Sequence, residues 1–305
     1  MTRDAALPWL ALVVFGAGWG LIQPMTKIAV NGGFELFDIM VWQGAVTLAL
    51  AGGFAVRKGL PKGGEQWLFC TQIAFLGTLV PHFASFTAIS YIPAALVAII
   101  MALIPIFALT FSALVGREAL TPLRITGILM GLSAIVLIAA TLGAVGPGPL
   151  WAVAVRTIAP LCYAINSTIT VTHGMAGLHP LQAYAGAAMI FLPISFFSAD
   201  WSDQFRGVGV DFVSFAVLAS AVGHTLIYAG YLWLLTRSGA VFASQTAYLV
   251  TGFCIIWSML ILGERYSGWV WVALILMLAC LTLVRPAVTR AQTVLAQDRR
   301  PHDTY

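Results

Sequence analysis

The sequence predicts an all-α integral membrane protein with about ten transmembrane helices, arranged as two inverted five-helix repeats. The composition is the first reason, because 60% of the 305 residues are hydrophobic and only 9% are charged. Soluble domains carry about 25% charged residues, so most of this surface must face lipid. The second reason is that the sequence contains apolar runs long enough to cross a bilayer. The third reason is an internal repeat.

A membrane-spanning helix needs roughly 20 mainly apolar residues. By that measure we expect spans near 8–30, 36–56, 67–91, 93–115, 122–142, 150–172, 180–198, 212–235, 239–262 and 267–285. The connections are short and polar or rich in Gly and Pro, and only 200–211 forms an extended hydrophilic loop. We therefore expect a cytoplasmic N-terminus (1–7), a first repeat (8–142), a linker (143–149), a second repeat (150–285) and a cytoplasmic tail (286–305).

The repeat is clearest in the apolar run 94–118, which ends in Gly-Arg-Glu and returns as 240–264. Glu118 and Glu264 lie 146 positions apart, and the same offset pairs Phe107 with Phe253 without a gap. Each half holds five expected spans, an odd number, so the second copy must enter the membrane in the opposite direction. Inverted repeats of this kind allow a central site to open to either side in turn.

The basic residues set the orientation, because Lys and Arg accumulate on the cytoplasmic side of a membrane protein. We place the chain in the cell (inner) membrane with both termini on the cytoplasmic side. That side then receives Arg3, Arg57, Lys58, Lys62, Arg117, Arg124, Arg237, Arg285, Arg290, Arg299 and Arg300. The opposite side receives only Arg206 and Arg265, which makes cytoplasmic termini the expected arrangement.

Two histidines lie near the middle of corresponding spans, His82 in the third and His224 in the eighth. Polar groups at that depth are costly and usually face the bundle interior or a water-filled cavity. The two imidazoles are therefore candidates for binding solute or coupling protons. The alternative is that each is packed against a neighbouring carbonyl or hydroxyl.

Other polar and aromatic side chains at comparable depth complete a candidate substrate site. Its remaining members are Trp19, Gln23, Gln43, Tyr163, Asn166, Tyr228, Gln245 and Tyr248. Pro24 follows Gln23 and frees a backbone carbonyl inside the membrane, which makes the first helix a candidate site wall. The alternative is an ordinary proline kink, with Gln23 hydrogen-bonded across to another helix. A lining rich in rings and amides suits a neutral, zwitterionic or aromatic solute, although any single ring can instead serve packing or lipid contact.

Lys27 and Arg156 lie within about two turns of the outer boundary, so we expect both to extend toward the headgroups. Either would be the best anchor for a substrate carboxylate if it pointed inward. Gly127 and Gly131 form a GxxxG pattern, which predicts a close helix contact within the chain or between two copies in a homodimer.

The sequence offers no pattern typical of a cofactor, a metal or a nucleic acid. The four cysteines lie inside apolar runs without metal-ligand spacing. HExxH, GxSxG and paired acidic residues within a span are absent, which argues against an intramembrane enzyme. No nucleotide-binding GxxxxGK[ST] occurs either, so a transporter of this sequence would use a gradient. A small-molecule solute and the lipid bilayer are the expected partners.

The doubled Gly-Arg-Glu/Gly-Glu-Arg, the WGLIQP-x-x-K run from Trp19 to Lys27, and Ala94 followed by Pro105 resemble EamA-type members of the drug/metabolite transporter superfamily. The resemblance covers about 8–285 and implies a ten-helix carrier, often an exporter of amino acids, metabolites or toxic compounds. The second copy departs from the first at Thr251, which stands where the first has Pro105. We therefore expect a secondary transporter, with a non-transporting receptor or assembly protein as the alternative.

Overall fold

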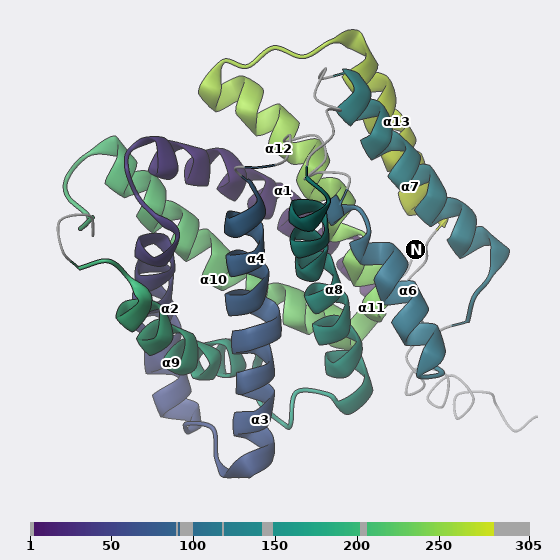
Figure 1. Ribbon diagram of the computed structural model, residues 1–305. Coiled ribbons are helices and arrows are strands. Elements are labelled where there is room, and N and C mark those ends of the chain that lie inside the picture. Colours follow the sequence, from purple (N-terminus) through teal and green to yellow (C-terminus); the bar gives the residue numbers. More distant parts are fainter. Residues whose placement is uncertain are drawn as a thin grey trace, which may run out of the picture.

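The computed structural model describes residues 3–89, 91, 100–117, 119–141, 149–201 and 206–283, and all regular structure in them is helical (Figure 1). The first half contains α1 (Arg3–Asn31), α2 (Leu36–Lys58), α3 (Gly63–Ala74), the π-helical turn η1 (Phe75–Leu79), α4 (Val80–Ile89), α6 (Ile104–Leu114) and α7 (Pro122–Thr141). The second contains α8 (Leu150–His173), α9 (Pro180–Ser198), α10 (Phe212–Ser238), α11 (Ala240–Ser244), α12 (Thr246–Leu262) and α13 (Gly268–Leu283).

In the described part of the chain, seven helical runs are long and apolar enough to cross a membrane. They are Ala6–Asn31, Leu36–Lys58, Gly63–Ser85, Leu150–His173, Pro180–Ser198, Phe212–Ser238 and Ala240–Leu262. Ile104–Leu114, Pro122–Leu137 and Gly268–Cys280 are shorter apolar helices at three further predicted positions. The predicted helical, multi-span fold is therefore confirmed. The start of the span expected at 93–115, Glu118, nearly all of the linker and the tail lie outside the described residues.

Local sequence explains where several helices begin. Pro180 occupies the first turn of α9, where its missing N–H is not needed. His179 before it closes a capping box, accepting from Leu181 N at 3.3 Å while its own N donates to Gln182 Oε1 at 3.2 Å. Asp211 caps α10 by accepting from Ser214 N at 2.9 Å.

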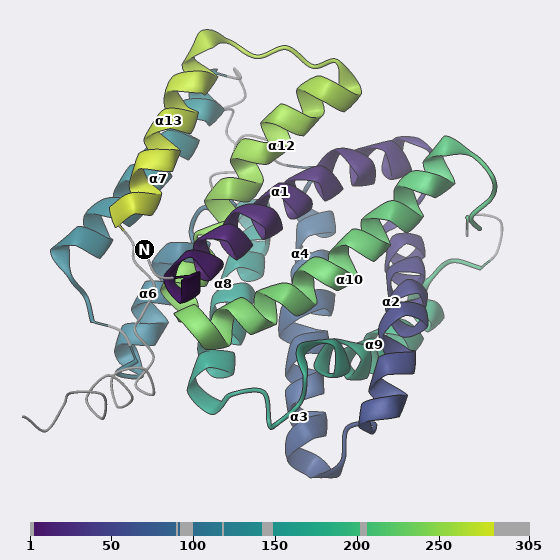
Figure 2. The same cartoon turned by 180° about the vertical axis from the view of Figure 1, so that it is seen from behind.

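The first helix lies between two helices of the second half, α10 and α12 (Figure 2). Gly20 permits the contact with α12, because a Cβ there would lie 2.7 Å from Phe253 Cβ. Small residues at such positions let backbones approach closely where no hydrophobic force drives helices together in lipid.

Each helix of the first half and its counterpart in the second half pack against corresponding neighbours. α1 packs on α10 and α12, while its counterpart α8 packs on α4 and α6. α2 pairs with its counterpart α9, and α7 with its counterpart α13. A duplicated five-helix unit would produce this pattern, which supports the predicted repeats without testing their boundaries.

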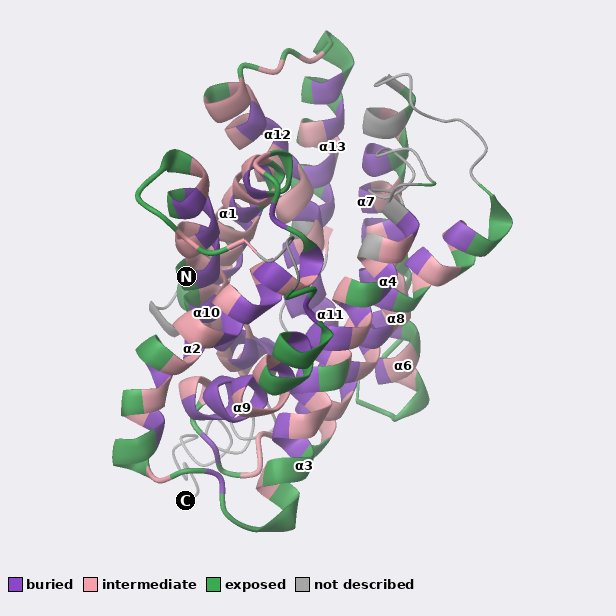
Figure 3. Cartoon of the chain, turned by 60° about the vertical axis from the view of Figure 1, so that its left-hand side comes forward, coloured by how far each residue is buried: buried purple, intermediate pink, exposed green. Residues whose placement is uncertain are grey.

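Several of the described connections lie at opposite ends of the bundle. Figure 1 shows the α12–α13 connection at the top, and the α2–α3 and α8–α9 connections at the bottom. Buried residues fill the interior between the helices, and exposed residues concentrate on the connections and outer faces (Figure 3). Polar side chains in the interior are therefore the ones that need an explanation.

Candidate functional site

A buried hydrogen-bonded triad joins α2, α9 and α10. Gln43 Nε2 donates to Tyr184 Oη at 2.8 Å and lies 3.0 Å from His224 Nδ1. Tyr184 Oη lies 3.0 Å from the same His224 nitrogen. Thr47 and Thr225 reinforce the α2–α10 contact with hydroxyl oxygens 2.8 Å apart. An amide, a phenol and an imidazole are thus satisfied by one another inside an apolar bundle.

A second hydrogen-bonded group joins α3, α8 and α10. Gln72 Nε2 donates to Asn166 Oδ1 at 2.9 Å, and Asn166 Nδ2 donates to Tyr228 Oη at 3.2 Å. The rings of Tyr228 and Tyr184 stack with centroids 4.6 Å apart, which connects this group to the triad. One polar network therefore ties together five helices from both halves of the chain.

The π-helical turn η1 lies beside this network. Gly77 is in the middle of the turn, and a Cβ there would overlap the Tyr228 hydroxyl. Single π turns are rare and often mark functional sites, because they turn side chains away from the regular helical register. Here the turn and the glycine together make room for Tyr228 against the backbone of the third span.

The two histidines predicted as a pair lie together, with ring centroids 6.1 Å apart. His82 Nδ1 donates to the Thr78 carbonyl at 2.7 Å, so its Nε2 is an acceptor. His224 Nδ1 accepts from the Gln43 amide, so its Nε2 carries the hydrogen. With these hydrogen-bond partners, the two free Nε2 atoms offer one acceptor and one donor.

Aromatic rings border the histidines on the α1 and α10 side. Trp19 lies 5.2 Å from Tyr231, 6.1 Å from His224 and 6.3 Å from Tyr228 by ring centroids. Trp19, Tyr231 and both histidines stay partly accessible despite these contacts, so space remains beside them. Gln23 is one turn from Trp19 on the same helix face and is exposed.

Two predicted site residues lie away from this centre. Tyr248 is fully buried against α7, where its hydroxyl donates to the Ile128 carbonyl at 3.0 Å and its ring covers Gly131. Gln245 is buried at the break between α11 and α12 and donates to the Val241 carbonyl at 3.3 Å. Among the described residues the Gln245 Oε1 atom is buried without a hydrogen-bond partner, and the contact of Tyr248 with Gly131 lies within the chain.

The structure adds members that the sequence reasoning missed, above all Gln72, Tyr184 and Tyr231. Gln72 carries the same signal that identified Gln43, a glutamine inside an apolar run, and could have been found. Tyr184 follows the start of α9 closely and looks like an interfacial tyrosine in the sequence. Only the packing of α9 against α2 brings its hydroxyl to Gln43.

The expectation for Arg156 was wrong. The side chain does not reach the headgroup region, because Arg156 is only 7% exposed and donates to Ser85 Oγ on α4. Tyr163, two turns further along α8, is partly accessible and shares its helix face. The basic group and the ring therefore lie on the inner side of the helix.

Lys27 remains exposed, but it also forms an ion pair that links α1 to the end of α12. Its Nζ lies 2.6 Å from Glu264 Oε1, and Tyr266 donates to the other carboxylate oxygen. The hydrogen bonds from Lys27 and then Tyr266 hold the pKa of Glu264 below its ordinary value. Glu264 thus contacts Lys27 across the bundle, while Glu118, its sequence counterpart, lies outside the described residues.

The residues that the structure describes hold no group of three or more His, Cys, Asp or Glu side chains placed to bind a metal ion. The cysteines among them, Cys70, Cys162, Cys254 and Cys280, are unpaired. The polar network itself consists of amide, phenol, hydroxyl and imidazole groups.

Comparison with known proteins matches residues 7–140 to the EamA-like transporter family, which belongs to the drug/metabolite transporter superfamily. This matched segment, residues 7–140, is therefore similar to an EamA-like domain. The EamA-like family is a family of transporters and not of enzymes. The matched segment runs from α1 through α6 and nearly all of α7, and it includes Trp19, Gln43, Gln72 and His82. No curated protein matches this sequence.

A solved structure described as "Crystal structure of protein" shares the fold of the whole chain. It superposes with a TM-score of 0.76 and 18% sequence identity, over 98% of this chain and 100% of that chain. The likeness therefore extends beyond the EamA-like domain to the helices of the second half, although at this identity it concerns the fold alone.

Proposed function

We propose that this EamA-like protein is a secondary transporter that exports small organic solutes through a central site between its two halves. The polar network joining five helices carries the proposal. Hydrogen-bonding groups buried in lipid are costly, and a structural protein could replace them with apolar side chains. A carrier needs them, because a polar solute must exchange its water for protein partners at mid-membrane.

The chemistry of the lining favours amino-acid-like, aromatic or drug-like solutes. Trp19, Tyr231 and Tyr228 present ring faces and edges, while the histidine Nε2 atoms present one donor and one acceptor. Such a lining can bind an aromatic or aliphatic group and a polar group at the same time.

The arrangement of the helices supports the alternating-access part of the proposal. The network takes Gln43 and Gln72 from the first half and Asn166, Tyr184 and His224 from the second. A rocking motion of one half against the other must therefore break or rearrange these hydrogen bonds. Solute that replaces them would lower the cost of that rearrangement, which is how binding is coupled to movement.

The test is flux of labelled solutes into liposomes that contain the purified protein. We expect saturable flux that falls at least tenfold in His82→Ala and in His224→Ala, since each change removes a hydrogen-bonding group from the centre. His173→Ala is the matched control, because His173 is exposed at the end of α8, and it should retain wild-type flux. Unchanged flux in both central variants would exclude the histidines from the mechanism.

Proton coupling through His82 and His224 is the second part of the proposal. Protonation of His224 at Nδ1 would remove the acceptor used by Gln43 and open the triad. Flux of a neutral solute should therefore respond to an imposed pH gradient in the wild type and lose that response in His224→Gln. Wild-type flux that does not change with the pH gradient would exclude proton coupling, but it would not contradict the proposal that the protein is a transporter.

A further inference from the structure

The most unusual charge in the described part of the chain is the Arg156 guanidinium. We infer that Arg156 binds the carboxylate of the transported solute, an inference that rests on the transport function proposed above. Arg156 is 7% exposed, lies in a membrane-spanning helix and makes no ion pair with any residue that the structure describes. A buried charge of this kind is retained where an opposite charge arrives to meet it.

Apolar contacts separate Arg156 from the nearby end of the bundle. Along the antiparallel pair α4 and α8, Tyr91 contacts Trp151 with ring centroids 4.7 Å apart. Ala88 and Ala152 follow one turn deeper in a shared buried cluster, and Ser85 and Arg156 come next. The guanidinium therefore cannot reach headgroups or water along α8 without displacing these contacts.

The hydrogen bonds of Arg156 leave donors unused. One nitrogen, Nη1, donates to Ser85 Oγ, and Ser85 Oγ in turn donates to the Pro81 carbonyl at 2.5 Å. The Nε atom is buried and has no hydrogen-bond partner. Leaving a guanidinium N–H unsatisfied in a low-dielectric interior is costly, which indicates that an acceptor is missing.

The geometry of the group selects a carboxylate. A guanidinium offers Nε and an Nη as a planar fork that matches the two oxygens of a carboxylate. A single positive charge balances a single negative one, whereas a phosphate dianion would leave excess negative charge in the membrane. The Thr78 hydroxyl, two turns from Ser85 on the other side of His82, is also buried without a partner. It supplies a further polar contact for a solute lying along α4.

His82 suggests what accompanies the carboxylate. It lies one turn from Ser85 on α4, with a free Nε2 acceptor that suits an ammonium or other N–H donor. A solute with a carboxylate next to an amine, and with an apolar or aromatic side chain directed toward Trp19 and Tyr231, meets all of these groups. The inferred substrate class is therefore an amino acid or a related carboxylate.

The experiment compares matched acids and amides, namely phenylalanine with phenylalaninamide, leucine with leucinamide, and benzoate with benzamide. Each is tested for liposome flux and for stabilisation of the purified protein against thermal unfolding. We expect the wild type to prefer at least one acid over its amide. Arg156→Gln should lower the affinity of the protein for that acid by about 10- to 100-fold, since a charge-assisted contact is lost. The affinity for the amide should not change.

Ser85→Ala is the matched control, because it removes the hydrogen bond from α4 and keeps the charge. It should retain the preference for the acid. Without solute, Arg156→Gln should unfold at or above the wild-type temperature, since an uncompensated buried charge is removed. A lower unfolding temperature in both variants, with no change in the acid-to-amide ratio, would mean that Arg156 only joins α8 to α4 and would overturn the inference.

The failures of the two proposals are distinguishable. Wild-type protein that carries amides as well as acids overturns the carboxylate assignment and leaves the carrier intact. Wild-type protein that moves none of these or other small solutes overturns the transport function, and the inference falls with it.

Discussion

At the scale of single residues, the central polar network depends on glycine and polar groups that fit one another closely. Tyr228 is the clearest case, because its ring stacks on Tyr184, its hydroxyl accepts from Asn166 and its ring makes a T-shaped contact with Trp19. Its hydroxyl lies over the backbone at Gly77, where any side chain would displace it. The position of this ring is thus set by four residues from four helices.

Gly77→Ala should therefore displace Tyr228 and disturb the network. We expect a loss of about 1–3 kcal/mol in the free energy of unfolding, as for other overpacked cores, and at least a tenfold loss of solute flux. Gly52→Ala is the control, because a Cβ at Gly52 meets nothing within 4 Å, and it should stay within about 1 kcal/mol of the wild type. Thermal unfolding in detergent measures both variants, and equal stability would show that Tyr228 adapts freely.

At the scale of elements, the regular geometry of a membrane-spanning helix is interrupted beside the central polar network. The third span changes from α3 through η1 to α4, and the change lies beside Tyr228 and His82. α1 is held against α12 by close packing at Gly20 and, at its far end, by the Lys27–Glu264 ion pair. The ion pair and the close packing together fix how α1 lies over the site.

The ion pair between Lys27 and Glu264 contributes to the free energy of unfolding, and this contribution depends on pH. Its sign follows from the lowered pKa of Glu264. A carboxyl with a folded-state pKa below its ordinary value of 4.5 stabilises the fold above that value, and the contribution disappears as the pH falls through the folded pKa. The wild type should lose up to about 1 kcal/mol in acid for this reason, since Lys27 is largely exposed.

Thermal unfolding measured from roughly pH 6 to pH 3 checks this contribution. Glu264→Gln and Lys27→Gln should both be less stable than the wild type at the upper end, and the difference should vanish at the lower end. Glu65→Gln is the control, because Glu65 is exposed at the start of α3, and its difference from the wild type should not follow the same curve. A constant difference for Glu264→Gln across the range would contradict the assignment.

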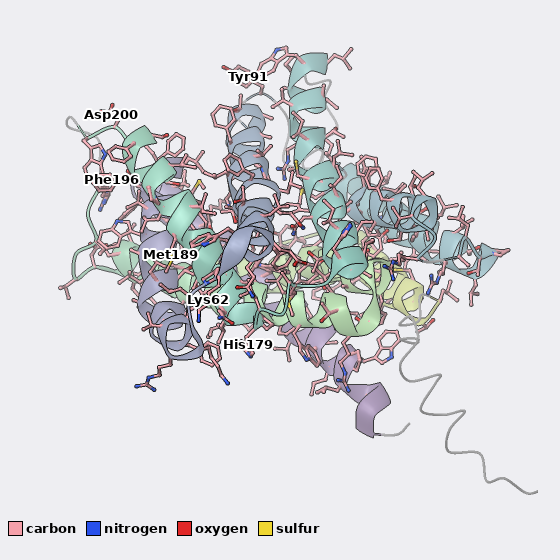
Figure 4. All side chains as sticks on the ribbon, turned by 90° about the horizontal axis from the view of Figure 1, so that it is seen from below. Lys62, Tyr91, His179, Met189, Phe196 and Asp200 are labelled. Carbon is pink, nitrogen blue, oxygen red and sulfur yellow. The ribbon has the colours of Figure 1, made fainter. Side chains whose placement is uncertain are left out.

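At the scale of the whole molecule, basic residues concentrate at one end of the bundle. Arg57 and Lys58 end α2, Lys62 precedes α3, and Arg237 lies in the last turn of α10. This end also holds an open pocket between the α2–α3 and α8–α9 connections, with Lys62 and His179 on its wall. Figure 4 views the molecule from below and labels both residues, well apart from Asp200 beyond the end of α9. We expect this end to face the cytoplasm.

Labelling of single cysteines tests the orientation and the inverted arrangement together. Arg117→Cys and Arg265→Cys, made in a variant without the four native cysteines, place one thiol in each corresponding exposed turn. An impermeant maleimide added to intact cells should react with the cysteine at 265 and reach the cysteine at 117 only after the membrane is opened. Reaction of both from the same side would contradict the inverted repeat.

The sequence by itself determined the fold class, most of the span positions and the middle of the site. Lipid requires long apolar runs, and polar residues inside them must meet partners, so Gln43, His82, Asn166 and His224 were visible without coordinates. Those four all belong to the central network or border it.

Only the tertiary structure decided which helix face points inward and which helix neighbours another. These choices separate Tyr184, which reaches Gln43, from Tyr248, which packs on α7. They also place Arg156 beneath apolar contacts, where the sequence favoured the headgroups. The physical reason is that hydropathy measures depth in the membrane, whereas contact depends on helix rotation and packing, which are set by residues far apart in the chain.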